Sequence, residues 1–305
     1  MSKFFDETRI AGHAAGTAQA DAGPVDLEAA VAALKKSGQT NGSALKDSDP
    51  RKFFKSIEEN DRLTAELAAK RLAGCVTIRL PRNEEKSFLV TQYNPSMQAA
   101  VDAYRTLRTR LTKRQVKNGL RSLAISSAAQ GEGKTLTAFN LALCYARMEN
   151  FPVLVVDADL RSQGMSRLLG EPTSGGLAKI LEGGCDYKSA IVATDFGRLY
   201  ALPAGSTTSS PPELFSGRTW SEFMGWATET FRLVIVDTPP ILNMADFELL
   251  MTACDGAILV VRSRKTASAS LSKTVAEVDP AKLIGVVFNA ADEQANGYGY
   301  YSPAG

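Results

Sequence analysis

The segment Ala128–Thr135, with the sequence AAQGEGKT, decides the fold of this chain. It follows the apolar run Leu123–Ile125 and precedes LTAFNLALCYARM, a run typical of a helix. A strand, a glycine-rich loop and a helix start therefore follow one another. This is the order of a phosphate-binding loop, in which backbone N–H groups and the positive end of the helix face a polyphosphate. The alternative is a glycine-rich turn that binds no ligand.

The residue types of this loop suit phosphate binding. Gly131 and Gly133 let the backbone turn its N–H groups toward phosphates. Lys134 neutralises phosphate oxygens, and the Thr135 hydroxyl is placed to hold Mg²⁺. The usual pattern begins with glycine, which Ala128 replaces with another small residue. The residues expected to bind the nucleotide here are Gln130, Gly131, Glu132, Gly133, Lys134, Thr135 and Leu136.

Two further apolar runs end in acidic residues. VLVVDADLR begins with four apolar residues typical of a buried parallel strand, and Asp157 and Asp159 follow them. Arg161 comes two residues later. LVIVDTPP repeats the pattern, and Asp237 ends that run. Because open α/β sheets bind ligands beyond the carboxyl ends of their strands, these carboxylates are expected to face a nucleotide, where they can hold Mg²⁺ or accept a proton. The alternative is that each acid caps the helix that follows it.

Composition limits the classes of function. With 305 residues and 44% hydrophobic content, the chain is long enough to bury a full α/β core. Its net charge of +2 does not favour nucleic-acid binding. Four scattered cysteines and one histidine support neither a disulfide framework nor a zinc site, and they favour a cytoplasmic protein. The sequence shows no secretory signal and no run of about 20 apolar residues, so we expect no direct membrane span.

The chain divides into three predicted regions. Residues 1–91 are expected to form a mostly disordered extension with one amphipathic helix between Pro50 and Ala73, which either packs on the domain or docks on a membrane or a partner. Residues 92–290 alternate strands and helices, which predicts an α/β domain with a doubly wound, mostly parallel sheet flanked by helices. Residues 291–305 form a flexible tail that contains Tyr298, Tyr300 and Tyr301.

Taken together, AAQGEGKT, VVDADLR, VIVDTPP and the tail tyrosines resemble the bacterial tyrosine autokinases of polysaccharide export, which are P-loop kinases. The resemblance covers residues 90–305. The segment DAYRTLRTRL is similar to the family helix that docks on a neighbouring subunit to close a ring. Its matching residues are Asp102, Arg105 and Arg108, where the family usually has glutamate in place of Asp102. The alternative for this segment is a solvated basic helix.

The resemblance also implies roles for individual residues. It places Lys134, Asp157, Asp159, Arg161 and Asp237 in catalysis, and Thr135, Asp157 and Asp237 at the Mg²⁺ ion. Asp159 would accept the tyrosine proton, and Arg161 would stabilise charge on the transferred phosphoryl group. Asn289, which follows the run IGVVF, would hydrogen-bond the adenine; its alternative is a turn residue.

The function implied by the resemblance is an ATP- and Mg²⁺-dependent kinase that phosphorylates Tyr298, Tyr300 and Tyr301 of neighbouring subunits. It would regulate the polymerisation and export of an exopolysaccharide or capsule, and a membrane chain-length regulator would recruit it to the inner face of the plasma membrane and activate it. The alternatives are a P-loop ATPase of the partitioning and positioning class, or a nucleotide-binding scaffold without kinase activity. Positioning relatives carry an extra lysine early in the loop, and Ala129 and Gln130 supply none, which favours the kinase.

Overall fold

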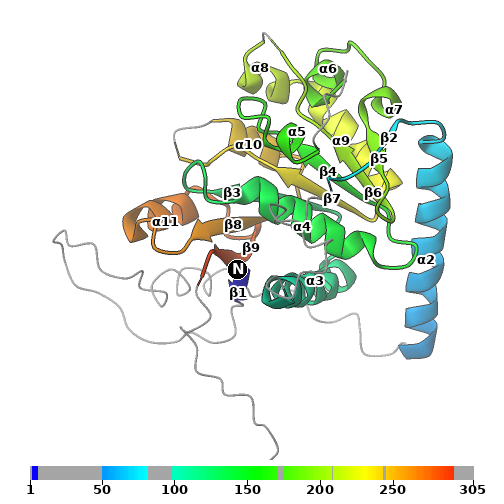
Figure 1. The fold of residues 1–305 in the computed structure, drawn as a ribbon, viewed down its shortest axis with the longest axis horizontal. Helices are drawn as coiled ribbons and strands as arrows, with labels where there is room; N and C mark the ends of the chain where they lie inside the picture. Colours follow the sequence, from blue (N-terminus) through cyan, green and yellow to red (C-terminus); the bar gives the residue numbers. More distant parts are fainter. Residues whose placement is uncertain are drawn as a thin grey trace, which may run out of the picture.

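The computed structural model describes residues 2–5, 50–81, 98–169, 175–207, 209–242 and 245–291 (Figure 1). Within these residues one sheet has nine strands in the order β1-β9-β8-β3-β7-β4-β6-β5-β2. The strands are β1 (Ser2–Phe5), β2 (Thr77–Ile78), β3 (Ser122–Ser127), β4 (Val153–Asp157), β5 (Val192–Thr194), β6 (Leu199–Leu202), β7 (Leu233–Asp237), β8 (Gly256–Arg262) and β9 (Leu283–Asn289). The helices are α2 (Pro50–Arg71), α3 (Gln98–Asn118), α4 (Lys134–Ala146), α5 (Gly164–Leu169), α6 (Leu177–Leu181), α7 (Tyr187–Ala190), α8 (Pro211–Ser216), α9 (Arg218–Thr230), α10 (Asp246–Met251) and α11 (Ser268–Ala276).

The centre of the sheet is parallel. Strands β9, β8, β3, β7, β4 and β6 all run in the same direction, whereas β5 is antiparallel to β6 and β1 is antiparallel to β9. Strands that are covered on both faces need apolar side chains at every position, which explains the unbroken apolar runs in the sequence. The predicted doubly wound, mostly parallel sheet is confirmed.

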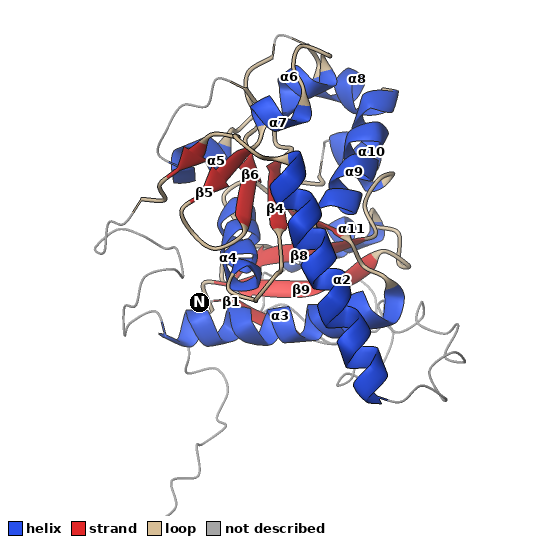
Figure 2. Cartoon of the chain, turned by 90° about the vertical axis from the view of Figure 1, so that its right-hand side faces the viewer, coloured by secondary structure: helices blue, strands red, loops and turns tan. Residues whose placement is uncertain are grey.

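Two hydrophobic cores lie on the two faces of the sheet. Successive side chains of a strand point to opposite faces, so Val153 and Val155 enter the core shared with α3, α4 and α5, while Leu154 and Val156 enter the core shared with α6, α8, α9, α10 and α11. Figure 2 shows the central strands between α4 on one side and α9 and α10 on the other. This double cover fixes the strand ends on which the functional residues lie.

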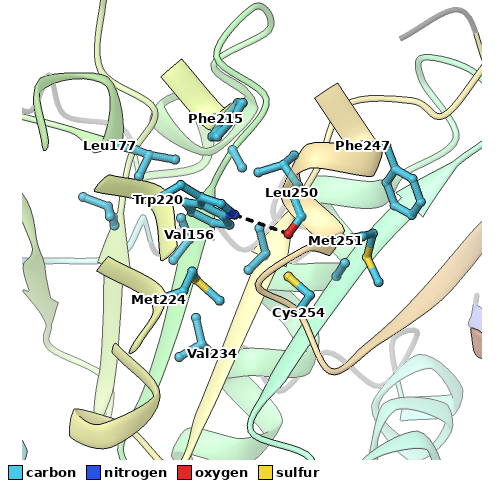
Figure 3. Close-up of a cluster of buried hydrophobic side chains, with 14 of the residues drawn as sticks. Val156, Leu177, Phe215, Trp220, Met224, Val234, Phe247, Leu250, Met251 and Cys254 are labelled. Atoms are coloured by element: carbon cyan, nitrogen blue, oxygen red, sulfur yellow. Dashed lines mark hydrogen bonds between the residues drawn. The ribbon is translucent and has the colours of Figure 1, made fainter. Parts of the chain in front are cut away.

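Trp220 anchors the second core. Its ring is fully buried and its indole Nε1 donates a hydrogen bond to the Leu250 carbonyl oxygen at 3.3 Å, which ties α9 to α10 (Figure 3). Phe215 packs edge-on against the same ring. Helix α10 is thereby held against α9 on this face of the sheet.

Part of the N-terminal extension belongs to the same structural unit. Helix α2 lies along α9, where Arg71 donates a hydrogen bond to the Thr230 hydroxyl at 2.6 Å. Asp61 of α2 pairs with Arg232, just beyond the end of α9. This arrangement agrees with the packing alternative for the amphipathic helix. Strands β1 and β2 also come from the extension, and they form the two edges of the sheet. The tail tyrosines lie outside the described residues.

None of the helices described combines the length and apolar character that crossing a bilayer requires.

Candidate active site

The glycine-rich segment forms a tight loop between β3 and α4. Gly133 precedes the first residue of α4 and has a φ of 98°, a left-handed conformation that favours glycine. A Cβ on Gly133 would lie 2.0 Å from the amide nitrogen of Asn289, so the position also lacks room for a side chain. Gly131 has a φ of 79°. The two glycines that the sequence singled out are therefore required by the backbone.

A cleft of about 360 Å³ opens above this loop, a size suited to part of a nucleotide. Its lining residues are Gln130, Gly131, Gly133, Lys134, Thr135, Leu136, Asp159, Ser162, Gly164, Arg167 and Leu168. The loop, the start of α4, the segment after β4 and helix α5 thus share one cavity. Another hollow, lined by Arg121, Met224 and Asp255, lies at the opposite ends of the strands and contains neither the loop lysine nor the three acids.

The two acids at the strand ends are direct neighbours. Asp157 of β4 and Asp237 of β7 occupy paired positions in the parallel register. Asp157 accepts hydrogen bonds from the backbone N–H of Asp159 at 3.2 Å and of Met165 at 3.0 Å, which fixes its carboxylate. The first turn of α5 is therefore attached to the end of β4.

Burial places these carboxylates in an unfavourable environment. Both are fully buried. Desolvation raises the pKa of Asp237 well above its usual range, and the charge of Asp157 raises it further, although the Thr135 hydroxyl and Lys134 lower it. Desolvation likewise raises the pKa of Asp157 to about 7. Neighbouring carboxylates at this depth need a cation or a proton between them.

The residues fit a Mg²⁺ ion. Both oxygens of Asp237 are buried without a close hydrogen-bond partner, although the Thr135 hydroxyl lies near enough to lower the pKa of this carboxyl. The described part of the chain contains no cluster of three or more His, Cys, Asp or Glu side chains able to bind a metal alone. Mg²⁺ is usually held by one or two carboxylates together with water and phosphate oxygens, so Asp237, Asp157 and the Thr135 hydroxyl are a sufficient protein contribution.

Comparisons with known proteins agree with this geometry. Residues 120–283 match the family model described as an AAA domain. The tyrosine-protein kinase YwqD of Bacillus subtilis is 34% identical over 203 residues, which is 66% of this chain and 85% of that protein. CpsD of Streptococcus agalactiae, also named a tyrosine-protein kinase, is 31% identical over 60% of this chain and 81% of its own length. The chain belongs to the bacterial tyrosine-protein kinase family.

Solved structures support the same family. The kinase domain of the Escherichia coli tyrosine kinase ETK superposes with a TM-score of 0.59 at 26% identity and covers 77% of this chain and 97% of that one. The chimerical protein CapA2B2 superposes with a TM-score of 0.62 at 25% identity and covers 73% and 97%. The fold around the phosphate loop is thus the fold of the family's kinase domains.

Two residues expected to contact nucleotide have other contacts in this kinase-family chain. The Glu132 side chain points away from the cleft, where it accepts hydrogen bonds from the Ala129 backbone N–H at 3.1 Å and from the Thr266 hydroxyl. The Asn289 amide nitrogen donates to the Glu132 carbonyl oxygen at 3.0 Å, and its oxygen accepts from the Ala290 N–H at 2.9 Å. These two side chains hold the phosphate loop against β9.

The end of β8 and the loop that follows it also brace the phosphate loop, a contact that the sequence motifs did not reveal. Arg262 donates to the Gly131 carbonyl oxygen at 3.1 Å, and the Lys265 ammonium lies 3.3 Å from the position of a Cβ on Gly131. The signal in the sequence was a run of basic residues directly after a buried strand. Strand β8 lies beside β3, and ligands bind at the carboxyl ends of parallel strands. Basic residues at the end of β8 are therefore close to the phosphate loop.

Arg161 forms an ion pair with Asp246 of α10. Its Nη2 lies 3.0 Å from one carboxylate oxygen and 3.3 Å from the other, and Asp246 is 1% exposed. Arg161 is not among the residues that line the cleft. Asp159, by contrast, lines it, and the structure therefore brings Asp159 together with Lys134 and Thr135.

The three residues implied in oligomerisation lie on α3 but have different environments. Asp102 and Arg105 form an exposed pair at 3.1 Å, with about half of each side chain accessible to solvent. Arg108 donates to the Cys144 carbonyl oxygen at 2.8 Å and so attaches α3 to α4. Two of the three residues are available on the surface, and the third supports the domain.

Proposed function

We propose that this chain is an ATP- and Mg²⁺-dependent protein-tyrosine kinase that phosphorylates tyrosines of neighbouring copies of itself. The observation that carries the proposal is the shared cleft: Lys134 and Thr135 lie beside Asp159 in one cavity. A phosphate-binding lysine next to an accessible carboxylate is the arrangement that transfer of a phosphoryl group to a hydroxyl requires.

Each cleft residue has a distinct part in the proposed transfer. Lys134 would neutralise the phosphate oxygens, while Thr135, Asp157 and Asp237 would hold the ion. A bound Mg²⁺ would draw charge from the breaking bond. The tyrosine oxygen would form a bond to the γ-phosphorus as the bond to the β-phosphate oxygen breaks, and ADP would leave.

Asp159 is the acceptor of the tyrosine proton in this proposal. Its Oδ1 accepts a hydrogen bond from the Ser162 backbone N–H at 3.1 Å, which orients the carboxylate. Oδ2 has no hydrogen-bond partner among the described residues. One oxygen is thus fixed by the loop, and the other is available to a tyrosine hydroxyl whose pKa is near 10 in water.

The tyrosines among the described residues are poor candidates for the acceptor. Within them, Tyr104 and Tyr145 are 3% and 0% exposed. Tyr187 is half-buried against Phe223 and Trp226, and Tyr200 packs on Phe231. None of these four side chains lines the cleft. We therefore propose the tail tyrosines Tyr298, Tyr300 and Tyr301 as acceptors.

Replacing the three tail tyrosines with phenylalanine is expected to remove most phosphate incorporation, because the remaining described tyrosines are packed away from the cleft. Mass spectrometry of the purified protein after incubation with Mg-ATP measures this loss. Mixing the triple variant with a Lys134→Met protein that keeps its tail tests transfer between copies, since only the intact tail can then be labelled. Undiminished phosphotyrosine in the triple variant, or ATP hydrolysis with no phosphotyrosine in the wild type, would contradict the proposal.

We further propose that α3 joins the copies into a ring. A fork of charged side chains on one helix face suits carboxylates on a neighbouring surface, and a ring raises the local concentration of tails at each cleft. Arg105→Ala is expected to lower the mass measured by light scattering and to slow phosphorylation. Lys113→Ala removes an exposed charge from the same helix and serves as the matched control. Equal masses for Arg105→Ala and the wild type would contradict the ring and indicate that this face of α3 is simply exposed to solvent.

The cellular setting follows from the family resemblance. We propose recruitment to the inner face of the plasma membrane by a membrane chain-length regulator, which activates the kinase and couples it to exopolysaccharide or capsule export. Stimulation of phosphotyrosine formation by a cytoplasmic peptide of a candidate regulator would support this partnership.

A further inference from the structure

Two arginines, Arg161 and Arg167, follow β4 in the sequence, and they have different environments in the structure. Arg161 is engaged in two-oxygen contact with the buried Asp246 and lies outside the cleft lining. Moving its guanidinium to a phosphoryl group would leave the Asp246 carboxylate buried and unpaired, which is strongly unfavourable. An arginine that neutralises a buried carboxylate is poorly suited to contact a phosphoryl group that binds and leaves in every catalytic cycle.

Arg167 of α5 has the opposite properties. Its side chain is exposed and lines the cleft beside Lys134, Thr135 and Asp159. The described residues supply no hydrogen bond or ion pair to its guanidinium. Its charge lowers the pKa of the nearby Asp157, which agrees with a position close to the acidic end of the cleft.

The backbone holds Arg167 in a defined place. The Met165 N–H donates to the Asp157 carboxylate at 3.0 Å, so the helix that carries Arg167 is attached to a residue of the Mg²⁺ site. Gly164 approaches Thr135 so closely that a Cβ there would lie 2.8 Å from the Thr135 hydroxyl oxygen. Helix α5 therefore packs directly against the start of α4, and its Arg167 lines the cleft.

We propose that Arg167 is a catalytic residue that contacts the γ-phosphoryl group of bound ATP and stabilises its charge during transfer. This proposal rests on the proposed kinase function. The guanidinium presents several N–H donors that match phosphate oxygens. Because Arg167 lines the cleft without a hydrogen-bond or ion-pair partner among the described residues, it can meet the γ-phosphoryl group without breaking a contact that those residues provide. Lys134, on the floor of the loop, would contact the phosphates of both ATP and ADP.

The test compares nucleotides that differ in the γ-phosphate. With Arg167→Gln we expect about tenfold weaker binding of AMP-PNP with Mg²⁺ in competition with a fluorescent ADP analogue, the size of one charge-assisted hydrogen bond. ADP affinity is expected to stay within about twofold. Tyrosine phosphorylation is expected to fall about 100-fold. Arg167→Lys, which keeps the charge, is expected to recover part of both losses.

Controls separate this role from general support of the fold. Arg218→Gln removes an exposed arginine on α9 outside the cleft and is expected to leave both affinities unchanged. Arg161→Gln is expected to lower the melting temperature, because Asp246 loses its partner. Equal losses of AMP-PNP and ADP binding in Arg167→Gln, or wild-type binding and transfer, would overturn the proposal. The binding comparison applies even if the wild type makes no phosphotyrosine, so failure of the kinase function remains distinguishable from failure of this role.

Discussion

Lys134→Met is expected to reduce tyrosine phosphorylation at least about 1,000-fold while the domain stays folded, because the loop lysine meets developing phosphate charge. Lys134 is 6% exposed at the first turn of α4, and its side chain lines the cleft. Methionine preserves the length and apolar stem of the side chain and removes only the ammonium. Phosphotyrosine detection and thermal unfolding measure the two effects.

The structure allows a second readout for this variant. Lys134 lowers the pKa of Asp237, so its loss should leave that carboxyl protonated to higher pH in the folded protein. A protonated Asp237 binds Mg²⁺ poorly, and we expect nucleotide affinity to fall more in the presence of Mg²⁺ than in EDTA. Wild-type phosphotyrosine levels in a folded Lys134→Met protein would rule out the assigned site.

Asp237→Asn is expected to stabilise the metal-free protein and to abolish most transfer. Asp237 is fully buried beside Asp157, and neither of its oxygens has a close hydrogen-bond partner. Removing one of two adjacent buried carboxylates relieves desolvation and repulsion worth about 1–2 kcal/mol. The same change removes a proposed ligand of the Mg²⁺ ion, and we expect phosphorylation to fall about 100-fold or more.

The stability gain has a defined pH dependence. An acid whose folded pKa is raised binds more protons in the folded than in the unfolded state, so the unfolding free energy falls as pH rises from the unfolded value toward the folded one. For the Asp157 and Asp237 pair this window begins near 4 and, for Asp157, extends to about 7. Thermal unfolding in EDTA at pH 5 and pH 8 should therefore show a larger advantage of Asp237→Asn at pH 8.

A matched aspartate provides the control. Asp255 lies at the opposite end of the sheet and accepts hydrogen bonds from the backbone N–H groups of Arg121 and Ser122, each at 2.8 Å. Asp255→Asn is expected to leave phosphorylation unchanged and to bring no stability gain, because this carboxylate is well satisfied. A stability loss in Asp237→Asn, with transfer at the wild-type rate, would show that Asp237 has a structural role.

Local patterns were sufficient to predict the centre of the fold. Apolar runs such as Val153–Val156 indicated buried strands, and the segment Ala128–Thr135 indicated a loop between strand and helix. Parallel strands end at the same edge of a sheet, so Asp157 and Asp237 were expected near the loop, and they are paired in the register.

Long-range contacts were not predictable in this way. The partner of Arg161 is Asp246, 85 residues further along the chain, and its own sequence neighbourhood carries no sign of the pairing. Glu132 is part of the loop motif, yet its side chain bonds Thr266, which is 134 residues away. Arg167 lies in a short helix without a motif, and only the packing of α5 on the loop places it in the cleft.

The sequence by itself determined the sheet class, the phosphate loop and the three acids, because each depends on spacing within one strand, loop and helix. The tertiary structure decided which charged side chains pair with other described residues and which line the cleft. It assigned Arg161 to the buried Asp246 and placed Glu132 and Asn289 as braces of the loop. It also placed Arg167 in the cleft, where none of the described residues pairs with it. The physical reason is that a buried charge must find a partner in space, and partners in space come from any part of the chain.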